Sequence, residues 1–382
     1  MNSIAIIGGL GHVGLPLGLF LAERGHRVYL VDPNEKAREA VRAGRMPFLE
    51  DGAQELLEKH WGKNVLFGML ELGNLSNDVS VKSADIIIVC IGTPLDEYQN
   101  PRLEPVLRLA REELADLRPD QLLILRSTVF PGTTRRIADE IGHPVSFCPE
   151  RIAQGHAVSE LAELPQLVSG TDQETADKAR HFFEGCGLRT VTLSTMEAEL
   201  AKLFTNSWRL IQFGAANDFL RIATDLGADY GRIHHAMTWD YPRCTIPVPG
   251  FAAGPCLRKD LLCLAAASPD GFHLGRQAVL SNELLVDWLV RRLDFASGAT
   301  VAILGAAFKP ENDDTRDSLS FRLKKLLEFR GARVLMTDPF VPGLVPLAEA
   351  MAQADLAIIA TPHAAYAGIP SGPKVVRIWE AA

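Results

Sequence analysis

The sequence predicts an α/β protein built from two doubly wound parallel-sheet domains joined by a helical middle segment. Two observations predict this fold class. Short runs of β-branched and apolar residues alternate with helical stretches up to about residue 190, and the same alternation begins again near Val301. Between them lies a long proline-free stretch with helical periodicity, Thr195 to Gly227. We expect three domains, with bounds 1–193, 194–295 and 296–382.

The N-terminal elements form a β-α-β unit followed by further buried strands. Residues Ile4 to Ile7 form a short β-branched run that ends at glycines, and a helical stretch then runs to Gly25. The second strand is "RVYLVD". Three later runs have the composition of parallel strands buried on both faces: "DIIIVCIGTP", "QLLILRST" and "PVSFCPE".

The second half of the chain is helical first and α/β afterwards. Helical segments are expected around Ile233 and from Gln277 to Leu293. A second β-α-β pattern follows, with a helix near Ser320 to Phe329 between strand-like runs. Those runs are "TVAILGAAF", "RVLMTD" and "ADLAIIATP".

Composition and charge exclude several classes of protein. The net charge is −8, which argues against binding to nucleic acid or to an anionic membrane surface. No stretch has about 18 uninterrupted apolar residues, and the N-terminus has no signal-peptide pattern. The six cysteines form no CxxC pair and no disulfide-like framework. We therefore expect a reduced cytoplasmic protein without a metal site.

The strongest local motif is Gly9-x-Gly11-x-x-Gly14 between a strand and a helix. This context is the one that a dinucleotide-binding, Rossmann-like domain requires, because the glycines allow a tight turn, approach of a pyrophosphate and close helix packing. His12 and Val13 lie within the motif. Asp32 ends the second strand, where a carboxylate meets ribose hydroxyls and repels a 2′-phosphate, which favours NAD over NADP.

Small hydroxyl residues follow two other strand-like runs. Thr93 belongs to "GTP" and Thr128 to "RST", and the carboxyl ends of the strands form the ligand crevice of a doubly wound sheet. Each threonine can therefore contact the cofactor or order a water. Strand-end capping explains either of them about equally well.

Two further pairs of residues have the spacing of one helical turn. Lys202 and Asn206 share a face of the long helix, where they can stabilise an oxyanion or form a solvated surface. Cys256 and Asp260 have the same spacing if a helix begins at "PGFAAGPCLRKD", and Lys259 lies beside them. A nicotinamide site and a thiolate together indicate alcohol or aldehyde oxidation with a covalent step. Spacing does not show that these residues meet.

Seven segments, in this order, resemble the UDP-glucose/GDP-mannose dehydrogenase family from end to end. They are "GGLGHVGLP", "GTP", "RSTVFPGTT", "CPERIAQG", "EAELAKLFTN", "PGFAAGPCLRKD" and "GAAFKPENDDTRDS". The segments around "CPER" and "YPRC" are most similar to members that oxidise UDP-N-acetyl-D-mannosamine and other UDP-N-acetylhexosamines. The resemblance implies oxidation of the sugar C6 alcohol to an acid with reduction of two NAD. Its expected product is a UDP-aminouronic acid for a surface polysaccharide or a related glycoconjugate.

The resemblance also implies a role for each matching residue. Cys256 is at the position of the family's nucleophile, which forms a thiohemiacetal and then a thioester. Asp260 and Lys202 are expected to handle protons through a water that Thr128 helps to hold. Lys202 and Asn206 are expected to stabilise oxyanions, and Glu150 is expected to be the general base for thioester hydrolysis.

The expected contacts of the ligands follow from the same match. Arg316 is expected near the cofactor. The residues expected to contact the nucleotide sugar are Glu150, Arg151, Lys202, Asn206, Gly250, Phe251, Gly254 and Lys309. Arg243 resembles a residue that reaches the substrate of a neighbouring subunit, which implies a homodimer through the long helix.

Three residues in or next to the segment "PGFAAGPCLRKD" differ from those that are frequent in the family, so the identity of the substrate stays open. Val248 and Ala253 stand where many members have glycine, and Arg258 stands where proline is frequent. UDP-glucose and GDP-mannose therefore remain alternative substrates. Two alternatives come from other functional classes: a two-electron β-hydroxyacid dehydrogenase, and a non-catalytic NAD-binding regulator on the same fold. The β-hydroxyacid dehydrogenase alternative needs neither the thiol nor a second α/β domain. The regulator alternative predicts an incomplete set of catalytic residues.

Overall fold

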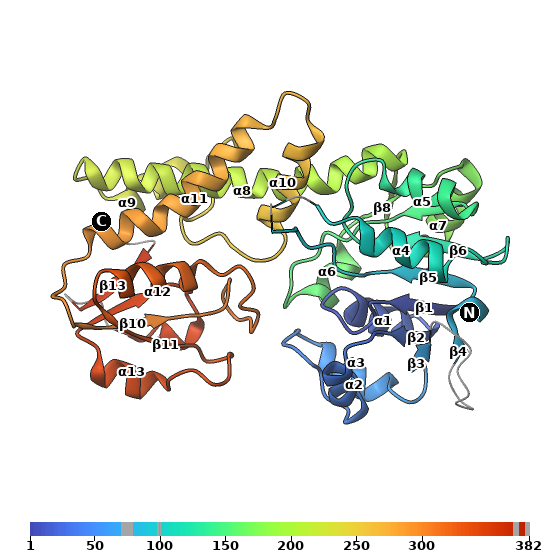
Figure 1. The fold of residues 1–382 in the computed structure, drawn as a ribbon, viewed down its shortest axis with the longest axis horizontal. Coiled ribbons are helices and arrows are strands. Elements are labelled where there is room, and N and C mark those ends of the chain that lie inside the picture. The colour runs from blue at the N-terminus through green and yellow to red at the C-terminus, as the bar shows by residue number, and fades with distance from the viewer. Residues whose placement is uncertain (70–78, 98, 100, 370–373, 379–382) are drawn as a thin grey trace. The chain divides into compact units, whose positions relative to one another are not determined.

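The computed structural model confirms the predicted α/β class (Figure 1). It describes residues 1–69, 79–97, 99, 101–369 and 374–378. The chain divides into two compact units, Met1–Phe204 and Thr205–Ala382. The three domain boundaries that we expect from the sequence stay a prediction.

The first unit contains a seven-stranded sheet in the order β4-β3-β2-β1-β5-β6-β7, and all its neighbouring strands are parallel. The strand order reverses between β1 and β5, which makes this a doubly wound sheet with its ligand crevice at the carboxyl ends of those strands. The strands are β1 Ser3–Ile7, β2 Arg27–Val31, β3 Val65–Met69, β4 Val79–Ser80, β5 Ile86–Val89, β6 Leu122–Leu125 and β7 Val145–Phe147.

Helices cover both faces of this sheet, as the buried apolar strands require (Figure 1). Alternate residues of β1 face opposite sides: Ile4 and Ile6 enter one core, while Ala5 and Ile7 enter the other. The first core is closed by α1 Gly14–Glu23, α2 Glu35–Arg42, α3 Ala53–His60 and α7 Gln173–Gly185. The second is closed by α4 Glu104–Glu113 and α5 Thr133–Ile141. The remaining elements are the 3₁₀ turn η1 Val81–Ser83, α6 Ala157–Glu163, β8 Gln166–Val168 and β9 Thr190–Thr192.

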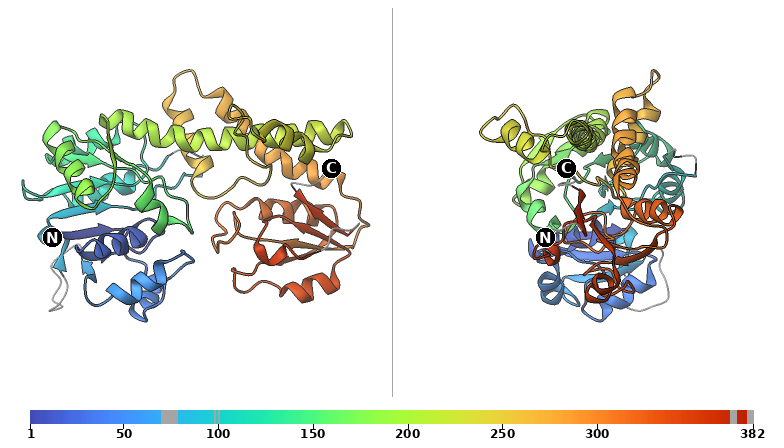
Figure 2. Two further views of the ribbon diagram at one scale, coloured as in Figure 1. Left: turned by 180° about the vertical axis from the view of Figure 1, so that it is seen from behind. Right: turned by 90° about the vertical axis from the view of Figure 1, so that its left-hand side faces the viewer.

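The second unit contains a four-stranded parallel sheet in the order β11-β10-β12-β13. One face packs against α8, α11 and α12, and the other packs against α13 (Figures 1 and 2). The strands are β10 Thr300–Leu304, β11 Arg333–Thr337, β12 Leu356–Ile359 and β13 Val375–Arg377. The helices are α9 Tyr230–Thr238, α10 Leu257–Ala267, α11 His273–Arg292, α12 Leu319–Phe329, α13 Leu347–Gln353 and the 3₁₀ turn η2 Ala364–Tyr366.

The long proline-free helix is confirmed as α8, Thr195–Asp225. It begins in the first unit and continues without a break into the second. It ends two residues before Gly227, whose φ of 73° is left-handed and stops the helix. Among the described residues, no helix combines the length and the apolar character needed to cross a bilayer.

A buried carboxylate fixes the beginning of α8 within the first unit. Glu199 is 1% exposed and accepts hydrogen bonds from the N–H groups of Gly132 at 2.6 Å and Thr134 at 2.9 Å. It also accepts the hydroxyl of Thr134 at 2.6 Å. These donors belong to the N-terminus of α5, whose free N–H groups attract a negative charge. Glu199 therefore sets the rotation of α8 about its axis, and with it the direction of Lys202 one turn later.

We expect Glu199→Gln to destabilise the protein by about 2 kcal/mol, because a neutral amide replaces a carboxylate that accepts three buried hydrogen bonds. Urea unfolding followed by circular dichroism measures the loss. The matched control is Glu197→Gln, since Glu197 lies on the same helix, is exposed and accepts hydrogen bonds from Ser194. An equal loss in both variants would contradict the role of Glu199.

Candidate functional site

The glycine-rich turn after β1 is tightly packed at two of its three motif glycines. A Cβ on Gly14 would lie 2.3 Å from the Gly8 carbonyl oxygen, and a Cβ on Gly9 would lie 2.7 Å from that of Ile6. A Cβ on Gly11 would meet only the Gly8 carbonyl oxygen, at 3.5 Å. Gly9 and Gly14 are therefore needed by the fold itself, whereas Gly11 leaves space beside the backbone for a ligand.

The N-terminus of α1 suits the pyrophosphate of a dinucleotide. Val13 is its N-cap residue and makes no side-chain capping hydrogen bond, and the positive end of the helix dipole lies at this turn. His12 stacks on Phe48, with ring centroids 4.0 Å apart. The residues present thus fit NAD, which the glycine turn would hold by its phosphates.

Asp32 has a structural role in addition to the predicted one. Its carboxylate accepts the N–H of Leu10 at 3.1 Å and the N–H of Asn34 at 2.9 Å. These bonds join the end of β2 to the glycine turn after β1, so the carboxylate is fixed beside that turn. The predicted contact with the ribose hydroxyls stays a prediction.

The threonines that follow two neighbouring strands lie side by side at the carboxyl edge of the sheet. The Thr93 hydroxyl donates to the carbonyl oxygen of Thr128 at 2.6 Å. Thr93 follows β5 and Thr128 follows β6, and these strands are paired. The bond ties the two loops together at the predicted crevice.

Glu150 and Lys202 form a buried ion pair in the first unit. The Lys202 Nζ lies 3.3 Å from Glu150 Oε1, and the two residues are 3% and 9% exposed. Glu150 also accepts the N–H of Ile152 at 2.8 Å. A lysine and a carboxylate in contact away from bulk water can exchange protons with a bound ligand.

A buried arginine holds the segment that carries Glu150, and the sequence analysis did not single it out. Arg126 is 1% exposed, and its Nη1 donates to the Cys148 carbonyl oxygen and to Gln166 Oε1, both at 3.1 Å. The guanidinium thereby joins the ends of β6 and β7 to β8. A charged residue inside an otherwise apolar strand, "LLILR", was the available signal.

Asn206 and Asp260 form a second buried polar pair, in the second unit. The Asn206 Nδ2 donates to Asp260 Oδ2 at 2.5 Å, and Lys259 Nζ lies 2.7 Å from the other oxygen, Oδ1. Asp260 is 1% exposed. Lys202 and Asn206 therefore project from one face of α8, each next to a buried carboxylate.

Cys256 is the N-cap residue of α10, which confirms that a helix begins at the thiol. The N–H of Asp260 donates to the Cys256 carbonyl oxygen at 2.9 Å. The thiol is exposed, whereas burial raises the pKa of Cys90 to about 12 and the pKa of Cys148 to about 11. A thiol at a helix N-terminus is favoured as a thiolate, so Cys256 has the surroundings of a nucleophile.

Two buried asparagines hold the loop before Cys256, and sequence reasoning missed both. Asn217 on α8 donates to the Gly250 carbonyl oxygen at 3.0 Å and accepts the Gly250 N–H at 2.9 Å. Asn282 on α11 contacts Ala252 in the same two-way manner. Asn217 also donates to Asn282 at 3.0 Å. Amides inside apolar helical segments were the signal, because buried polar side chains need partners.

The remaining predicted ligand contacts lie on loops of both units. In the first unit Arg151 is half-buried and donates to the Pro165 carbonyl oxygen at 2.5 Å. In the second unit Phe251 is half-buried, and exposed Arg243 lies over the Tyr241 ring. Lys309 is half-buried, and Arg316 pairs with Asp314. In the described part of the chain, no three His, Cys, Asp or Glu side chains are grouped as metal ligands would be.

Three family models match the chain in order. The NAD binding domain of the UDP-glucose/GDP-mannose dehydrogenase family matches residues 2–186, and its central domain matches residues 196–283. The UDP binding domain of the same family matches residues 302–377.

Individual relatives resemble the chain over nearly its full length. A UDP-N-acetyl-D-mannosamine dehydrogenase from Pyrococcus horikoshii is 29% identical, with 96% of this chain and 90% of that protein covered. A UDP-glucose 6-dehydrogenase from Bacillus subtilis is 28% identical, with 88% and 79% covered. The solved structure of a UDP-glucose dehydrogenase from Pyrobaculum islandicum superposes with a TM-score of 0.87 at 26% identity, covering 100% of this chain and 95% of that one.

We expect the glycines of the turn to separate folding from cofactor binding. Gly14→Ala should cost about 1–3 kcal/mol of stability, because its Cβ overlaps backbone atoms. Gly11→Ala should leave the melting temperature of the ligand-free protein nearly unchanged and weaken NAD binding about tenfold or more, because its Cβ occupies the approach of the pyrophosphate. Thermal unfolding and calorimetric titration with NAD measure the two effects. Full NAD affinity in Gly11→Ala would contradict this assignment.

Proposed function

Because this chain belongs to the UDP-glucose/GDP-mannose dehydrogenase family of NAD-dependent oxidoreductases, we propose that it oxidises C6 of a UDP-N-acetylhexosamine from alcohol to carboxylate. The observation that carries the proposal is the exposed Cys256 thiol at the N-terminus of α10, one turn before the buried Asp260 that Asn206 contacts. UDP-N-acetyl-D-mannosamine is the first candidate substrate. We expect the product to enter a surface polysaccharide or a related glycoconjugate, and the reaction to take place in the cytoplasm.

The relatives support this substrate and leave two alternatives to be tested. The protein from Pyrococcus horikoshii is named for UDP-N-acetyl-D-mannosamine, and the protein from Bacillus subtilis for UDP-glucose. By the resemblance to the family, Val248 and Ala253 stand where many members have glycine, and Arg258 stands where proline is frequent. UDP-glucose and GDP-mannose are therefore the alternative substrates.

The first oxidation needs a base for the C6 hydroxyl proton. The glycine turn of Gly9, Gly11 and Gly14 would hold NAD, which would supply the hydride acceptor for each oxidation. Asp260 would take the proton through a water that Lys202 and Thr128 help to hold. Lys202 and Asn206 would stabilise the alkoxide, since each offers a buried donor from the same face of α8.

The second oxidation needs a nucleophile, because a free aldehyde does not readily release hydride. The Cys256 sulfur would add to the aldehyde carbon and form a thiohemiacetal, and loss of hydride would convert this to a thioester. Glu150 would remove a proton from the water that opens the thioester, which releases the acid and restores the thiol. The Lys202 ammonium group, 3.3 Å from Glu150 Oε1, would hold this carboxylate in place for that step.

The remaining predicted residues would bind the ligands. Arg316 would lie near the cofactor, and Arg151, Gly250, Phe251, Gly254 and Lys309 would bind the nucleotide sugar. The backbone of Gly250 and Ala252 is already held by Asn217 and Asn282, so this loop is preorganised.

We also propose that two copies of the chain associate along α8. An exposed apolar stripe is formed by four side chains of this helix, Phe204, Trp208, Phe219 and Ile222, and by Leu226 directly after it. At 100° per residue they fall within about 60° of one another around the helix axis. On another side of α8, Gly214 packs against Ala278 of α11. One side of α8 is thus packed within the chain, while the apolar stripe on the other side is exposed. Such a stripe is suited to contact with a second copy of the chain. In that dimer, Arg243 would reach the substrate bound by the partner subunit.

Two functional alternatives predict different reaction products. A two-electron β-hydroxyacid dehydrogenase makes one NADH per substrate and needs no thiol, and a non-catalytic regulator makes none. The intact set of Cys256, Asp260, Asn206, Lys202 and Glu150 favours the four-electron reaction over both.

We expect two NADH per sugar consumed with UDP-N-acetyl-D-mannosamine. Absorbance at 340 nm counts NADH in a panel that also contains UDP-N-acetylglucosamine, UDP-glucose and GDP-mannose. One NADH per sugar would exclude the thioester route, and none from any sugar would support the regulator. Cys256→Ser should keep NAD and sugar binding but lose acid formation by about a thousandfold or more. The control Cys244→Ser removes a half-buried thiol elsewhere and should leave the rate unchanged.

We expect Trp208→Asp combined with Ile222→Asp to convert a dimer into a monomer of 41.7 kDa, because two charges would enter an apolar interface. Light scattering after size exclusion measures the mass. Phe329→Asp is the control, since Phe329 is 90% exposed and lies on α12, away from the stripe. A monomeric unmodified chain would contradict the proposed dimer.

A further inference from the structure

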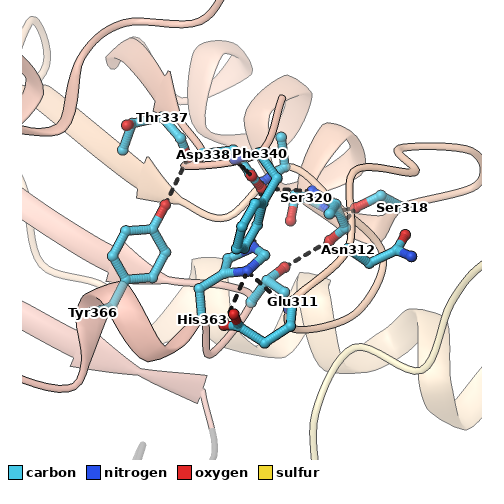
Figure 3. Close-up of polar contacts among 12 residues, drawn as sticks. Glu311, Asn312, Ser318, Ser320, Thr337, Asp338, Phe340, His363 and Tyr366 are labelled. Atoms are coloured by element: carbon cyan, nitrogen blue, oxygen red, sulfur yellow. Dashed lines mark hydrogen bonds and ion pairs between the residues drawn. The ribbon is translucent and has the colours of Figure 1, made fainter. Parts of the chain in front are cut away.

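A buried histidine–aspartate pair in the second unit holds the backbone turn that follows β10. His363 is 2% exposed, and its Nε2 lies 3.1 Å from Asp338 Oδ2, while its Nδ1 lies 3.1 Å from the N–H of Glu311 (Figure 3). A backbone N–H can only donate, so Nδ1 is the acceptor. The proton of the neutral ring is therefore on Nε2, which donates it to Asp338.

Asp338 ties the same turn to the end of β11. Its Oδ2 accepts the N–H groups of Ala306 at 2.8 Å and Ala307 at 3.0 Å, and its Oδ1 accepts the N–H of Phe340 at 2.9 Å. Burial alone would raise the pKa of Asp338, but hydrogen bonds from His363, Ala307 and Phe340 lower it. The carboxylate therefore stays charged inside the fold and keeps all these donors directed at it.

The turn adopts a conformation that needs such support. Glu311 has a φ of 50°, in the left-handed region that residues other than glycine rarely adopt. Its N–H is bound by His363, and its Oε1 accepts the N–H of Ala364 at 2.7 Å. Fully buried Asn312 accepts the N–H of Asp314 at 2.8 Å. The path of residues 308–316 thus depends on the contact with His363.

The other side of the turn meets the loop that carries the thiol. A Cβ on Gly254 would lie 2.7 Å from the Phe308 ring, so the backbone two residues before Cys256 rests directly on that ring. The N–H of Phe308 donates to the carbonyl oxygen of Asp314 at 3.0 Å, which closes the turn. Gly254 has a φ of 96° and cannot accept a side chain here.

Arg316, at the end of the turn, is held in one direction by a bidentate ion pair. Its Nε lies 2.9 Å from Asp314 Oδ1, and its Nη2 lies 2.6 Å from Oδ2. The hydrogen bonds from Arg316 to Asp314 raise the pKa of Arg316, and an electrostatic interaction with Cys256 raises it further. Because Asp314 also accepts the N–H of Phe308, whose ring rests against Gly254, this ion pair belongs to the turn that packs on the loop carrying Cys256.

We propose that the His363–Asp338 pair is a positioning device that places the Arg316 guanidinium beside the Cys256 sulfur, where its charge favours the thiolate. The inference rests on the proposed role of Cys256 as the nucleophile. It assigns Arg316 a task separate from the expected contact with the cofactor.

Charged residues of α10 next to Cys256 in the chain form ion pairs of their own. On α10, Arg258 lies 3.2 Å from Glu283 of α11, and Lys259 lies 2.7 Å from Asp260. On the turn, Asp314 and Asp317 accompany Arg316. Removing the Arg316 charge leaves the Asp314 carboxylate without its guanidinium partner, and a nearby negative charge disfavours the thiolate.

The test measures alkylation of Cys256 by iodoacetamide from pH 5.5 to 9.5, in the full chain without NAD or sugar. Peptide mass spectrometry follows the Cys256 peptide alone. We expect Arg316→Gln to slow alkylation at pH 7 about threefold or more and to move its pH midpoint upward, and Arg316→Lys to recover part of the rate. His363→Leu should act in the same direction. His363→Gln should be closer to the unmodified chain, because its amide can accept from Glu311 and donate to Asp338.

Tyr366→Phe is the matched control for destabilisation. Tyr366 is 2% exposed and packs edge-on against the His363 ring, and its hydroxyl donates to the carbonyl oxygen of Thr337 on β11. We expect normal alkylation in this variant.

An unchanged rate and midpoint in Arg316→Gln would overturn the proposal. Equal slowing in His363→Leu and Tyr366→Phe, or no recovery in His363→Gln, would overturn the role of His363. If His363→Leu does not fold, Arg316→Gln still decides the question. Because the assay contains neither cofactor nor sugar, failure of the proposed dehydrogenase reaction is detected separately, by the NADH count.

Discussion

The arrangement of the candidate site depends on the hydrogen bonds that Glu199 accepts at the N-terminus of α5. A long helix is free to rotate about its axis until something fixes it, and a rotation of one residue would turn Lys202 away from Glu150. Glu199 is buried, and its partners are backbone N–H groups that no neighbouring helix residue can satisfy. A local electrostatic preference therefore fixes the direction in which Lys202 points from α8 within the first unit.

The same physical device recurs in both units: a buried polar side chain holds a backbone turn that carries reactive groups. In the first unit, Arg126 holds the segment of Glu150. In the second, Asn217 and Asn282 hold the loop before Cys256, and His363 holds the turn before Arg316. Buried polar groups of this kind have little freedom, because an unmade hydrogen bond costs more than a made one contributes. Loops held in this way keep their functional groups in place before a ligand arrives.

The residues proposed for proton transfer and the proposed nucleophile differ in their exposure to solvent. Glu150, Lys202, Asn206 and Asp260 are buried and paired, which suits proton transfer and the stabilisation of developing charge. Cys256 is exposed, and Cys148 and Cys263 are buried. A nucleophile has to reach its substrate, while a general base works better away from competing water. This contrast supports a separate covalent step for the thiol.

Local sequence patterns were enough to predict the fold class, the glycine turn, the long helix and the helix that begins at Cys256. Each of these follows from local rules: strand and helix periodicity, glycine geometry and the spacing of one helical turn. Thr93 and Thr128 were placed at one sheet edge because parallel strands end together. The tertiary structure alone decided the partners of the buried polar groups, namely Glu199 with α5, Arg126 with Cys148 and Gln166, Asn217 with Gly250, and His363 with Glu311. Such partners are separated by tens of residues, and a hydrogen bond between them leaves no periodic trace in the chain.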